Sequence, residues 1–247
     1  MLGIDRLSKH FGGVRAVQEV DLRIGENEIV GLIGPNGSGK STIVNLVTGV
    51  FAPTAGRVHF RDRDITGWPP HRVLASGIGR TFQNIRLFGG LTVWQNLWVV
   101  RSAPGPAAGR GGWAGSRRRA ARIEATLEFC RLLDKKDALA RSLALGEQRR
   151  LELARTLAAD PAVLLLDEPA AGMSAAEVEE LRQRILTLKQ RGKTIVLIEH
   201  HMELLMTVAE RVAVLNFGQK IAEGTPAAVQ EDARVREAYL GQPGARG

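Results

Sequence analysis

The sequence is poor in the features that mark exported, membrane-spanning and fibrous proteins. Cys130 is the single cysteine, so the chain cannot form an internal disulfide, and we expect a reduced compartment such as the cytosol. Residues 1–10 contain no apolar run after a basic start, so we expect no secretory signal. No stretch approaches the ~18 uninterrupted apolar residues of a membrane-spanning helix, and no internal repeat or heptad run is visible. Contact with a membrane would therefore need a partner or surface charge.

The composition is close to the average for soluble globular proteins. The 247 residues include 44% hydrophobic and 24% charged residues, which excludes disordered, collagen-like and coiled-coil chains. At ~150 residues per domain, this length fits one large domain or two small ones. Lys and Arg (34) outnumber Asp and Glu (26), and the net charge is +8. Such a balance suits nucleic acid, an anionic membrane surface or a polyphosphate ligand, and it does not choose among them.

Alternating strand-like and helix-like segments predict a sheet covered by helices. Three short apolar runs without polar alternation are typical of strands buried on both faces of a parallel sheet: Ile29–Ile33, Ala162–Leu166 and Thr194–Ile198. Between the last two, apolar residues recur at helical spacing from Val178 to Leu188 and predict an amphipathic helix that packs on the sheet. Strand, helix and strand together make a βαβ crossover.

The other segments include a hairpin, a terminal helix and one loop-like stretch. Val212–Glu223 predicts two short strands around a turn at Phe217–Gln219, and Ala227–Leu240 predicts a C-terminal helix. Ser102–Arg122 is rich in Pro, Gly and Arg, which predicts a solvated loop between two helices. The alternative is that its three arginines, Arg117–Arg119, contact acidic lipid or a partner.

The segment Gly34–Ser41, GPNGSGKS, fits the G-x-x-x-x-G-K-[ST] pattern of a phosphate-binding loop. It follows the Ile29–Ile33 run and precedes a helical run, Ser41–Val47, so that backbone N–H groups and a helix N-terminus can face the same anion. Lys40 would reach the β- and γ-phosphates, and Ser41 would place its hydroxyl on Mg²⁺. Unless this is a glycine-rich turn without a ligand, the residues that contact the nucleotide are Gly34, Pro35, Asn36, Gly37, Ser38, Gly39, Lys40, Ser41 and Thr42.

A second segment, Leu164–Glu168, combines a buried strand with two carboxylates at its C-terminal edge. Open α/β sheets bind ligands at this edge. We expect Asp167 to hold Mg²⁺ and Glu168 to orient or deprotonate a water that attacks the γ-phosphate. The alternative is that the pair only caps the next helix.

A histidine belongs to the same edge of the predicted sheet. His200 follows the Thr194–Ile198 run, so it would emerge beside Asp167 and Glu168, where a γ-phosphate contact fits. A histidine at a strand end is more often structural, and the adjacent His201 leaves the choice between the two open.

A further motif gives the chain a family resemblance. Leu143–Gln148, LALGEQ, runs into RRLELARTLAADP and resembles the signature helix of ATP-binding cassette (ABC) ATPases. Phosphate loop, glutamine-bearing loop, signature, Asp-Glu strand and switch histidine follow one another in the family's order between Phe11 and His200. The resemblance implies an α/β fold: a P-loop nucleotide-binding core with a mainly parallel sheet, an N-terminal antiparallel β part and an inserted α-helical subdomain.

The resemblance also implies roles for single residues. Phe11 matches the aromatic side chain that stacks on adenine, and Gln83 in RTFQN matches the loop glutamine that contacts Mg²⁺ and senses the permease. His200 matches the switch histidine, and together with Lys40, Gln83 and Glu168 it completes the expected catalytic set. The resemblance also implies a head-to-tail dimer with two ATP molecules at the interface. A monomer should therefore hydrolyse ATP poorly. Signature residues expected at the partner's nucleotide are Leu143, Ala144, Gly146, Glu147 and Gln148.

Four segments narrow the resemblance to the ATP-binding subunit of branched-chain (hydrophobic) amino acid importers. They are GIGRTFQNIRLFGGLTVWQNL from Gly77, DEPAAGMS from Asp167, IEHHM from Ile198 and a closing EAYLG. Such a subunit implies integral membrane permease partners, a second ATPase subunit in a homo- or heterodimer, and a solute-binding protein reached indirectly. It would lie at the cytoplasmic face of the plasma (inner) membrane, bound there through the permease.

The same resemblance divides the chain. Residues 1–247 would form a single ABC ATPase domain, with 1–86 and 144–247 as the nucleotide-binding core. Residues 87–143 would form the helical subdomain that docks on the permease, with the arginine-rich loop 102–122 as an insertion there.

Two residues depart from the general family pattern. The signature serine is replaced by Ala144, so a hydroxyl that would bond the partner's γ-phosphate is absent. A hydrogen bond to a charged group contributes ~1.5 to 3 kcal/mol, so closure of the dimer would weaken unless backbone N–H groups of the signature helix suffice. The usual aspartate after the Asp-Glu strand is replaced by Ser174. We interpret both as features of the importer subgroup.

Other functions share this ATPase core. A nucleic-acid-associated ABC ATPase would suit the charge of +8, but such proteins usually carry coiled-coil insertions, zinc motifs or two ATPase units, so no nucleic acid partner is expected. A urea importer or a lipid-handling exporter would use the same core. The transported substrate does not touch this chain, and the sequence leaves it open.

Overall fold

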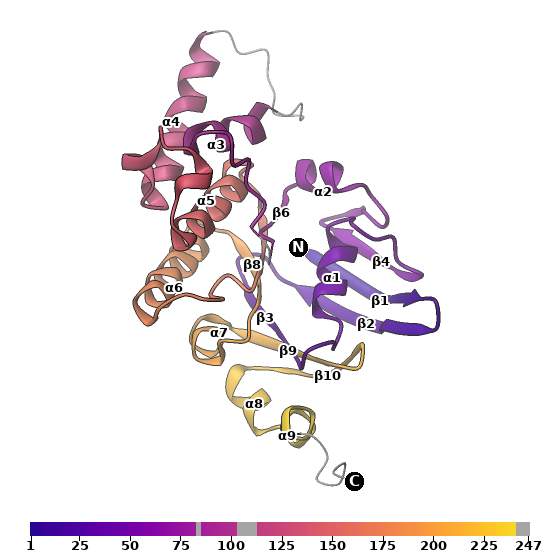
Figure 1. Cartoon of the computed structure of the whole chain (residues 1–247). Coiled ribbons are helices and arrows are strands. Elements are labelled where there is room, and N and C mark those ends of the chain that lie inside the picture. Colours follow the sequence, from indigo (N-terminus) through magenta and orange to yellow (C-terminus); the bar gives the residue numbers. More distant parts are fainter. Residues whose placement is uncertain (83–84, 103–112, 241–247) are drawn as a thin grey trace.

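The computed structural model describes residues 1–82, 85–102 and 113–240, and it contains two sheets (Figure 1). A six-stranded sheet has the order β10-β9-β3-β8-β7-β6. Its strands are parallel except β10, which pairs antiparallel with β9. Their bounds are β3 (Ile29–Ile33), β6 (Ile78–Arg80), β7 (Val163–Asp167), β8 (Thr194–Ile198), β9 (Arg211–Asn216) and β10 (Gln219–Gly224).

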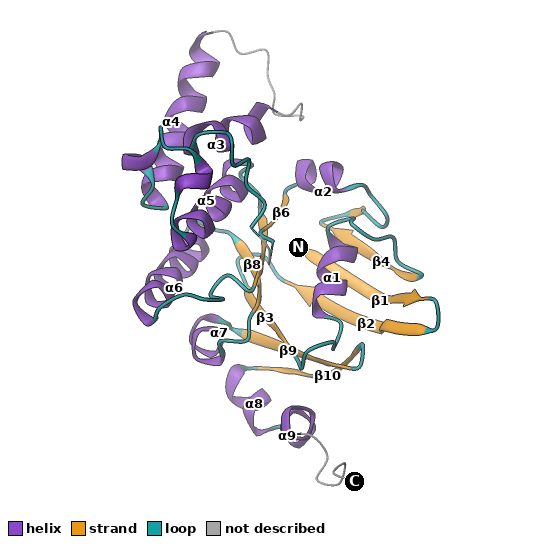
Figure 2. Cartoon of the chain, viewed as in Figure 1, coloured by secondary structure: helices purple, strands orange, loops and turns teal. Residues whose placement is uncertain are grey.

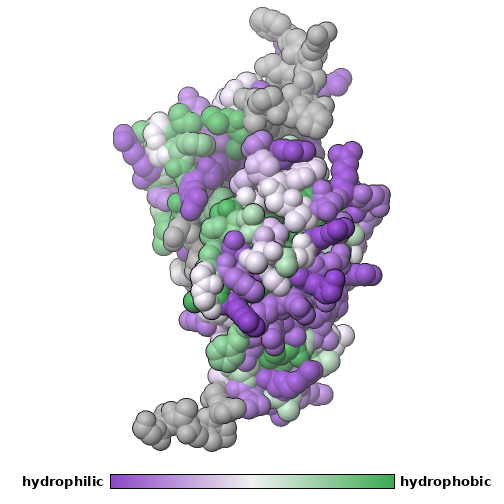
Figure 3. Space-filling view, turned by 90° about the vertical axis from the view of Figure 1, so that its right-hand side faces the viewer, coloured by the Kyte–Doolittle hydropathy of each residue, from purple (hydrophilic) through white to green (hydrophobic). Residues whose placement is uncertain are grey.

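The second sheet is antiparallel and comes from the N-terminal part of the chain. Its order is β2-β1-β4-β5, from β1 (Leu2–Phe11), β2 (Val14–Ile24), β4 (Ala55–Phe60) and β5 (Arg63–Asp64). The face that carries this sheet is turned toward the viewer in Figure 3 and is largely hydrophilic. The expected mainly parallel core with an N-terminal antiparallel part is confirmed.

Most helices gather on the side of the six-stranded sheet that faces away from the antiparallel sheet (Figure 2). The exceptions are α1 and α2, which lie on the side of the antiparallel sheet, and α8 and α9, which lie beyond the edge strand β10. The helices are α1 (Lys40–Val47), α2 (Pro70–Ser76), α3 (Val93–Ser102), α4 (Trp113–Phe129), α5 (Leu145–Ala158), α6 (Ala175–Gln190), α7 (Met202–Val208), α8 (Pro226–Glu231) and α9 (Ala233–Leu240), with short 3-10 turns at Leu133–Lys135 and Ala140–Ser142.

Two hydrophobic clusters fill the two faces of the parallel sheet. In β8, Ile195 and Leu197 belong to the cluster beneath the helices α3 to α7, whereas Val196 and Ile198 belong to the cluster beneath α1 and the antiparallel sheet. Successive side chains of a strand point to opposite faces, so an apolar run without alternation supplies both clusters. The predicted burial of these strands on both faces is confirmed.

The arginine-rich stretch differs from the expectation of a loop over 102–122. Helix α4 begins at Trp113 and includes Arg117–Arg119, and residues 103–112 lie outside the described part of the chain. The Pro and most of the Gly residues precede Trp113, whereas RRRAAR from Arg117 consists of strong helix formers. The first half of the stretch therefore favours a loop and the second half a helix. Arg119 packs its guanidinium 3.6 Å from the centre of the Trp98 ring on α3.

The C-terminal segment also differs in one detail, while the hairpin agrees. The predicted strands around Phe217–Gln219 are β9 and β10. The predicted single helix over 227–240 is two helices, because Asp232 adopts an extended conformation and its carboxylate accepts the Arg234 N–H (2.8 Å). An aspartate that offers its side chain to the backbone in this way ends one helix and starts the next.

The helical region is joined to the sheet through α5. This helix packs against α3 and α4 and also against β6. Cys130, after α4, is completely buried, and burial raises the pKa of its thiol to about 12. Within the described ranges, no helix combines the length and the apolar character needed to cross a bilayer. The boundary of the subdomain at residues 87–143 stays a prediction.

Candidate active site

Two glycines of the phosphate loop are required by the backbone. Gly34 has a φ of 150°, and a Cβ on it would lie 2.1 Å from the Leu215 carbonyl oxygen on β9. Gly39 has a φ of 107° at the N-cap of α1, where a Cβ would lie 2.6 Å from the Ala16 oxygen on β2. Other residues would be strained and would clash at both places. The loop is therefore held closely between two strands, and it directs the N-terminus of α1 toward its own concave side.

Lys40 is buried inside this loop. Its Nζ donates to the carbonyl oxygens of Gly34 (2.7 Å) and Pro35 (3.0 Å). Burial lowers the pKa of the Lys40 ammonium, and the nearby carboxylates of Glu168 and Asp167 oppose that shift. The predicted loop lysine and both predicted carboxylates thus lie close enough to interact, although they are more than 120 residues apart along the chain.

Asp167 ends β7 and is almost completely buried. Its Oδ2 accepts from Arg80 Nη2 (3.0 Å), and its N–H donates to Thr81 Oγ1 (3.2 Å). Burial raises the pKa of Asp167, and the Arg80 guanidinium opposes this. Among the described residues no hydrogen-bond partner exists for Asp167 Oδ1, although this atom is buried. A buried, unpartnered carboxylate oxygen beside the loop fits the hard oxygen ligand that Mg²⁺ requires.

Glu168 and His200 meet at the carboxyl edge of the sheet. The Glu168 Oε1 atom lies 3.2 Å from His200 Nε2. The Glu168 N–H donates to the Ile198 carbonyl oxygen (2.8 Å), which continues the pairing of β7 with β8 by one residue. Glu168 has a φ of 50°, an uncommon value for a residue with a side chain, and such strain is typical of functional sites. The two expected side chains are therefore brought together.

The structure resolves two alternatives that the sequence left open. His201 is the N-cap of α7 and its Nδ1 accepts the Leu204 N–H (3.2 Å), so the structural role belongs to His201 and the contact with Glu168 to His200. The Asp-Glu pair does not cap the next helix, because Ser174 is the N-cap of α6.

Glu199 was not predicted as a site residue, although it positions this edge. Its Oε1 accepts the Ala170 N–H (2.6 Å), and its Oε2 accepts the N–H groups of His200 (3.0 Å) and His201 (3.2 Å). The side chain is buried. One carboxylate therefore ties the loop after β7 to the loop after β8. The only sequence signal is a carboxylate directly after an apolar strand.

The structure says less about the two residues expected to contact adenine and Mg²⁺, Phe11 and Gln83. Phe11 lies at the end of β1, is 43% exposed, and packs edge-on against Phe51 with 5.3 Å between ring centres. Its exposed ring is available for stacking, so the predicted adenine contact stays a prediction. Gln83 lies outside the described residues.

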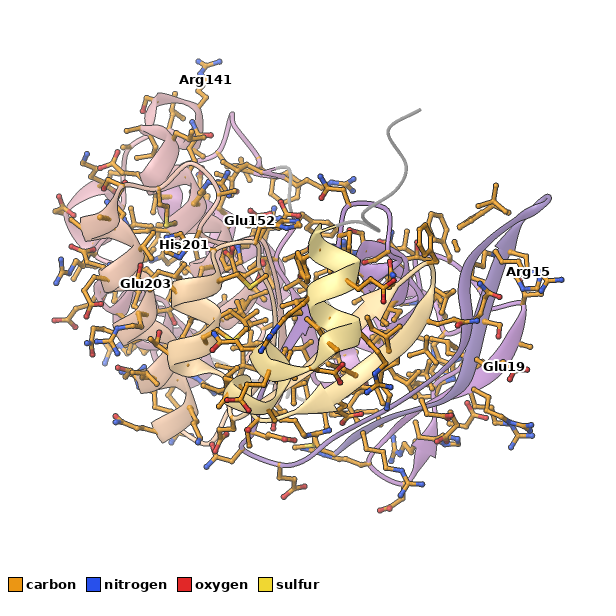
Figure 4. All side chains as sticks on the ribbon, turned by 90° about the horizontal axis from the view of Figure 1, so that it is seen from below. Arg15, Glu19, Arg141, Glu152, His201 and Glu203 are labelled. Atoms are coloured by element: carbon orange, nitrogen blue, oxygen red, sulfur yellow. The ribbon has the colours of Figure 1, made fainter. Side chains whose placement is uncertain are left out.

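Glu152 on α5 flanks the Gln83 position and was missed by the sequence analysis. This buried carboxylate accepts the N–H groups of Phe82 (3.2 Å) and Arg86, one on either side of that position. Burial raises the pKa of Glu152. Figure 4 labels Glu152 in the interior of the molecule, whereas Arg141 lies at its edge. The signature helix therefore holds the backbone at Phe82 and at Arg86.

Glu152→Ala is expected to lower the free energy of unfolding by about 1 to 3 kcal/mol, because two backbone N–H groups lose a buried acceptor. Hydrogen exchange at the amides of Phe82 and Arg86 should also become faster. Glu152→Gln keeps an oxygen acceptor and is the matched control, with exchange closer to that of the unchanged protein. Exchange that stays the same in Glu152→Ala would contradict the contact.

The signature begins α5 without a side-chain cap. Ala144 at the N-cap offers no hydroxyl, and the Glu147 carboxylate accepts the Ala144 N–H (3.1 Å). Glu147 forms an ion pair with Lys135. The hydrogen bond that Lys135 donates within this pair lowers the pKa of Glu147. Gln148 donates to the Leu143 carbonyl oxygen (2.9 Å). Two of the predicted nucleotide contacts, Glu147 and Gln148, thus already have partners within the chain.

The signature and the phosphate loop lie in different parts of the chain. Buried residues of α5 belong to the cluster on the helical face of the sheet, and those of α1 belong to the cluster on the opposite face. Figure 1 shows the two helices on either side of the parallel strands. The signature of this chain therefore does not cover its own phosphate loop.

Ser174, the second departure, has a structural role here. Its Oγ accepts the Glu177 N–H (3.4 Å), and the Glu177 carboxylate accepts the Ser174 N–H (2.9 Å). This reciprocal capping box satisfies two N–H groups at the start of α6. The serine thus does locally what an aspartate could also do.

Ser174→Ala is expected to destabilise the chain by about 1 kcal/mol, the usual cost of losing an N-cap. Ser174→Asp is the matched control, because a carboxylate caps equally well and interacts favourably with the helix N-terminus. Urea unfolding of the purified chain measures both. A stability of Ser174→Ala equal to that of the unchanged chain would refute the cap.

Helix α9 lies next to the phosphate loop and faces it across an open cavity. The loop residues 35–38 and the α9 residues Arg234 and Glu237 line one open cavity of about 670 Å³. The phenol of Tyr239 approaches the Gly34 N–H; burial raises its pKa and the N–H group opposes this. This contact between the C-terminal helix and the loop was not predicted from the sequence.

Comparisons with known proteins agree with this geometry. The family model for ABC transporters matches residues 17–171, and the model for branched-chain amino acid ATP-binding cassette transporters matches residues 219–245. The chain is 40% identical over 250 residues to the high-affinity branched-chain amino acid transport ATP-binding protein LivG of Escherichia coli, with 98% of both chains covered. It is 35% identical over 242 residues to the lipopolysaccharide export system ATP-binding protein LptB of Haemophilus influenzae, again with 98% of both covered.

A solved structure is similar over the same length. The nucleotide-free ATP-binding cassette of an ABC transporter superposes with a TM-score of 0.87 and 31% identity, and the match covers 98% of this chain and 99% of that one. Sequence order, fold and site geometry thus agree. The chain belongs to the ABC transporter family, as one of its ATP-hydrolysing subunits.

Proposed function

We propose that this chain powers an importer for branched-chain or other hydrophobic amino acids. The observation that carries the proposal is the similarity to LivG along the whole chain, together with the match of the C-terminal segment to the branched-chain family model. The importer would hold the chain through integral membrane permease subunits at the cytoplasmic face of the inner membrane. A solute-binding protein on the other side would contribute indirectly.

The phosphate loop would bind the triphosphate of ATP. Lys40 would donate to the β- and γ-phosphates in place of its present carbonyl partners, since its ammonium already lies inside the loop. The N-terminal amides of α1 would add further donors. Phe11 would stack on the adenine ring.

Mg²⁺ would be held by Asp167 Oδ1, the Ser41 hydroxyl and Gln83. The unpartnered Asp167 oxygen supports this assignment, as does the position of Ser41 in the first turn of α1. When bound, the ion neutralises charge on the β- and γ-phosphates.

Hydrolysis would depend on the pair Glu168 and His200. Glu168 would orient a water for in-line attack on the γ-phosphorus and accept its proton. His200, 3.2 Å from Glu168, would hold that carboxylate and contact the γ-phosphate. Glu199 would keep both side chains in register through its three backbone contacts.

A second ATPase subunit would complete each site. The signature of one chain lies away from its own phosphate loop, so the N-terminus of α5 would face a nucleotide on a partner. The backbone amides of α5 would then replace the hydroxyl that Ala144 lacks. The partner would be an identical or a related ATPase.

Affinity purification from detergent-solubilised membranes of the source organism, followed by mass spectrometry, tests the proposal. A co-eluting multi-span permease is expected, and ATP hydrolysis by the reconstituted complex should rise with an amino-acid-loaded binding protein. A lipid-handling exporter is the second candidate, favoured by the similarity to LptB, and co-elution of lipid-transport subunits would support it instead. Nucleic acid that is lost on nuclease treatment would overturn both.

A further inference from the structure

Arg80 is a buried cation that the proposed mechanism does not use. It ends β6, and its guanidinium forms an ion pair with Asp167, with side chains only 10% and 2% exposed. Taking an arginine out of water costs several kcal/mol unless partners compensate for the loss of hydration. The groups that the Arg80 guanidinium contacts must therefore compensate for its lost hydration.

The guanidinium connects two elements of the site. Nη2 donates to Asp167 Oδ2 on β7 (3.0 Å), whereas Nη1 donates to Asn45 Oδ1 on α1 (2.5 Å) and lies 3.4 Å from Thr48 Oγ1. The helix α1 also carries Ser41, and β7 carries Asp167. Arg80 thus spans the two elements that supply expected ligands of the same ion.

Arg80 is itself fixed in place. Its backbone pairs with Leu165 on β7, and its carbonyl oxygen accepts from Thr156 Oγ1 on α5 (3.1 Å). Its guanidinium also lies 4.9 Å from the centre of the Phe82 ring. A bridge that is anchored at its own backbone can hold its partners at a defined separation.

The pairing leaves the two oxygens of Asp167 in different situations. Oδ2 is occupied by Arg80, and Oδ1 is buried without a hydrogen-bond partner among the described residues. Rotation of the carboxylate would break the contact with Arg80. Oδ1 is therefore held in one direction and remains available to a cation.

We propose that Arg80 is a positioning residue of the magnesium site, which orients Asp167 through Oδ2 and fixes α1 against β7 through Asn45. The inference rests on the proposed assignment of Asp167 to Mg²⁺. Orienting partners of metal ligands typically change metal affinity by about 10- to 100-fold when they are lost. Arg80 is not itself one of the proposed ligands of the ion.

Binding of Mn²⁺ to the ADP-loaded chain, followed by electron paramagnetic resonance, tests this role without hydrolysis. Arg80→Gln is expected to weaken Mn²⁺ binding by about tenfold or more, whereas ADP affinity in EDTA should change by less than about twofold. Arg80→Lys keeps the charge but cannot donate to both partners at once. Its Mn²⁺ affinity should lie between those of the unchanged chain and of Arg80→Gln. Arg61→Gln, on the exposed β4–β5 turn, is the matched control and should bind Mn²⁺ like the unchanged chain.

Two further variants separate the possible failures. Asn45→Ala removes one arm of the bridge without leaving Asp167 unpaired, and it carries the test if Arg80→Gln does not fold. Asp167→Asn should abolish Mn²⁺ binding; if it does not, the proposed magnesium site is wrong. If Asp167→Asn loses the ion while the Arg80 and Asn45 variants bind it normally, the inference about Arg80 is overturned. Tighter Mn²⁺ binding in Arg80→Gln would also overturn it, because Arg80 would then compete with the ion.

Discussion

Glu168→Gln is expected to reduce ATP hydrolysis by about 10²- to 10⁴-fold, the usual contribution of a general base. The amide cannot take a proton from water, but it preserves the volume of the side chain and a contact with His200. ATP binding should therefore persist, and the variant should accumulate as a closed dimer when ATP is added. Steady-state phosphate release and size-exclusion chromatography with ATP measure the two effects.

Glu203→Gln provides the matched control for this variant. Glu203 lies exposed in the first turn of α7, and its removal should leave both hydrolysis and assembly unchanged. Hydrolysis by Glu168→Gln near the rate of the unchanged protein, measured in the purified complex, would remove Glu168 from the mechanism. Loss of ATP binding would show instead that Glu168 shapes the nucleotide pocket.

Lys40→Ala should abolish measurable nucleotide binding. The ammonium lies between two carbonyl oxygens of the loop and near the carboxylates of Asp167 and Glu168. Without it, the triphosphate would enter beside the carboxylates of Asp167 and Glu168 without the loop's ammonium, and charge-assisted hydrogen bonds to the phosphates would be lost. We expect ATP affinity to fall by about two orders of magnitude or more, since such contacts contribute about 1.5 to 3 kcal/mol each.

Isothermal titration with ATP in EDTA measures this loss without the metal ion. Lys193→Ala is the control, because Lys193 pairs with Asp160 away from the site and should bind ATP normally when replaced. Unchanged ATP affinity of Lys40→Ala would contradict the assignment of the phosphate loop. The melting temperature of Lys40→Ala distinguishes a local effect from unfolding.

The residues at the sheet edge could be predicted because their positions follow from strand order. The carboxyl ends of parallel strands share one edge, so Asp167, Glu168 and His200 had to lie near one another once β7 and β8 were recognised. Lys40 follows from a motif whose geometry is local. Each of these predictions needed only the residues that directly follow a strand in the sequence.

Arg80, Glu152 and Glu199 could not be found in the same way. Each has a partner on another element: Arg80 contacts a residue 87 positions away, Glu152 contacts one 70 positions away, and Glu199 contacts one 29 positions away besides its own neighbours. No spacing pattern encodes such contacts, because they depend on how β6, α5 and β7 pack. The first part of α4, residues 113–122, was predicted as loop for a different reason, since its helix-forming arginines follow a stretch dominated by Pro and Gly.

Helix α5 makes contacts with consequences beyond one site. The signature begins it, Glu152 near its middle accepts the N–H groups of Phe82 and Arg86, and Thr156 near its end donates to the Arg80 carbonyl oxygen. Because α5 is a rigid helix, a shift at its N-terminus would move all of the groups that it contacts together. ATP on the partner's phosphate loop, held by the signature of one subunit, would thus alter that subunit's own magnesium site, and the two sites should hydrolyse ATP cooperatively, with a Hill coefficient above about one.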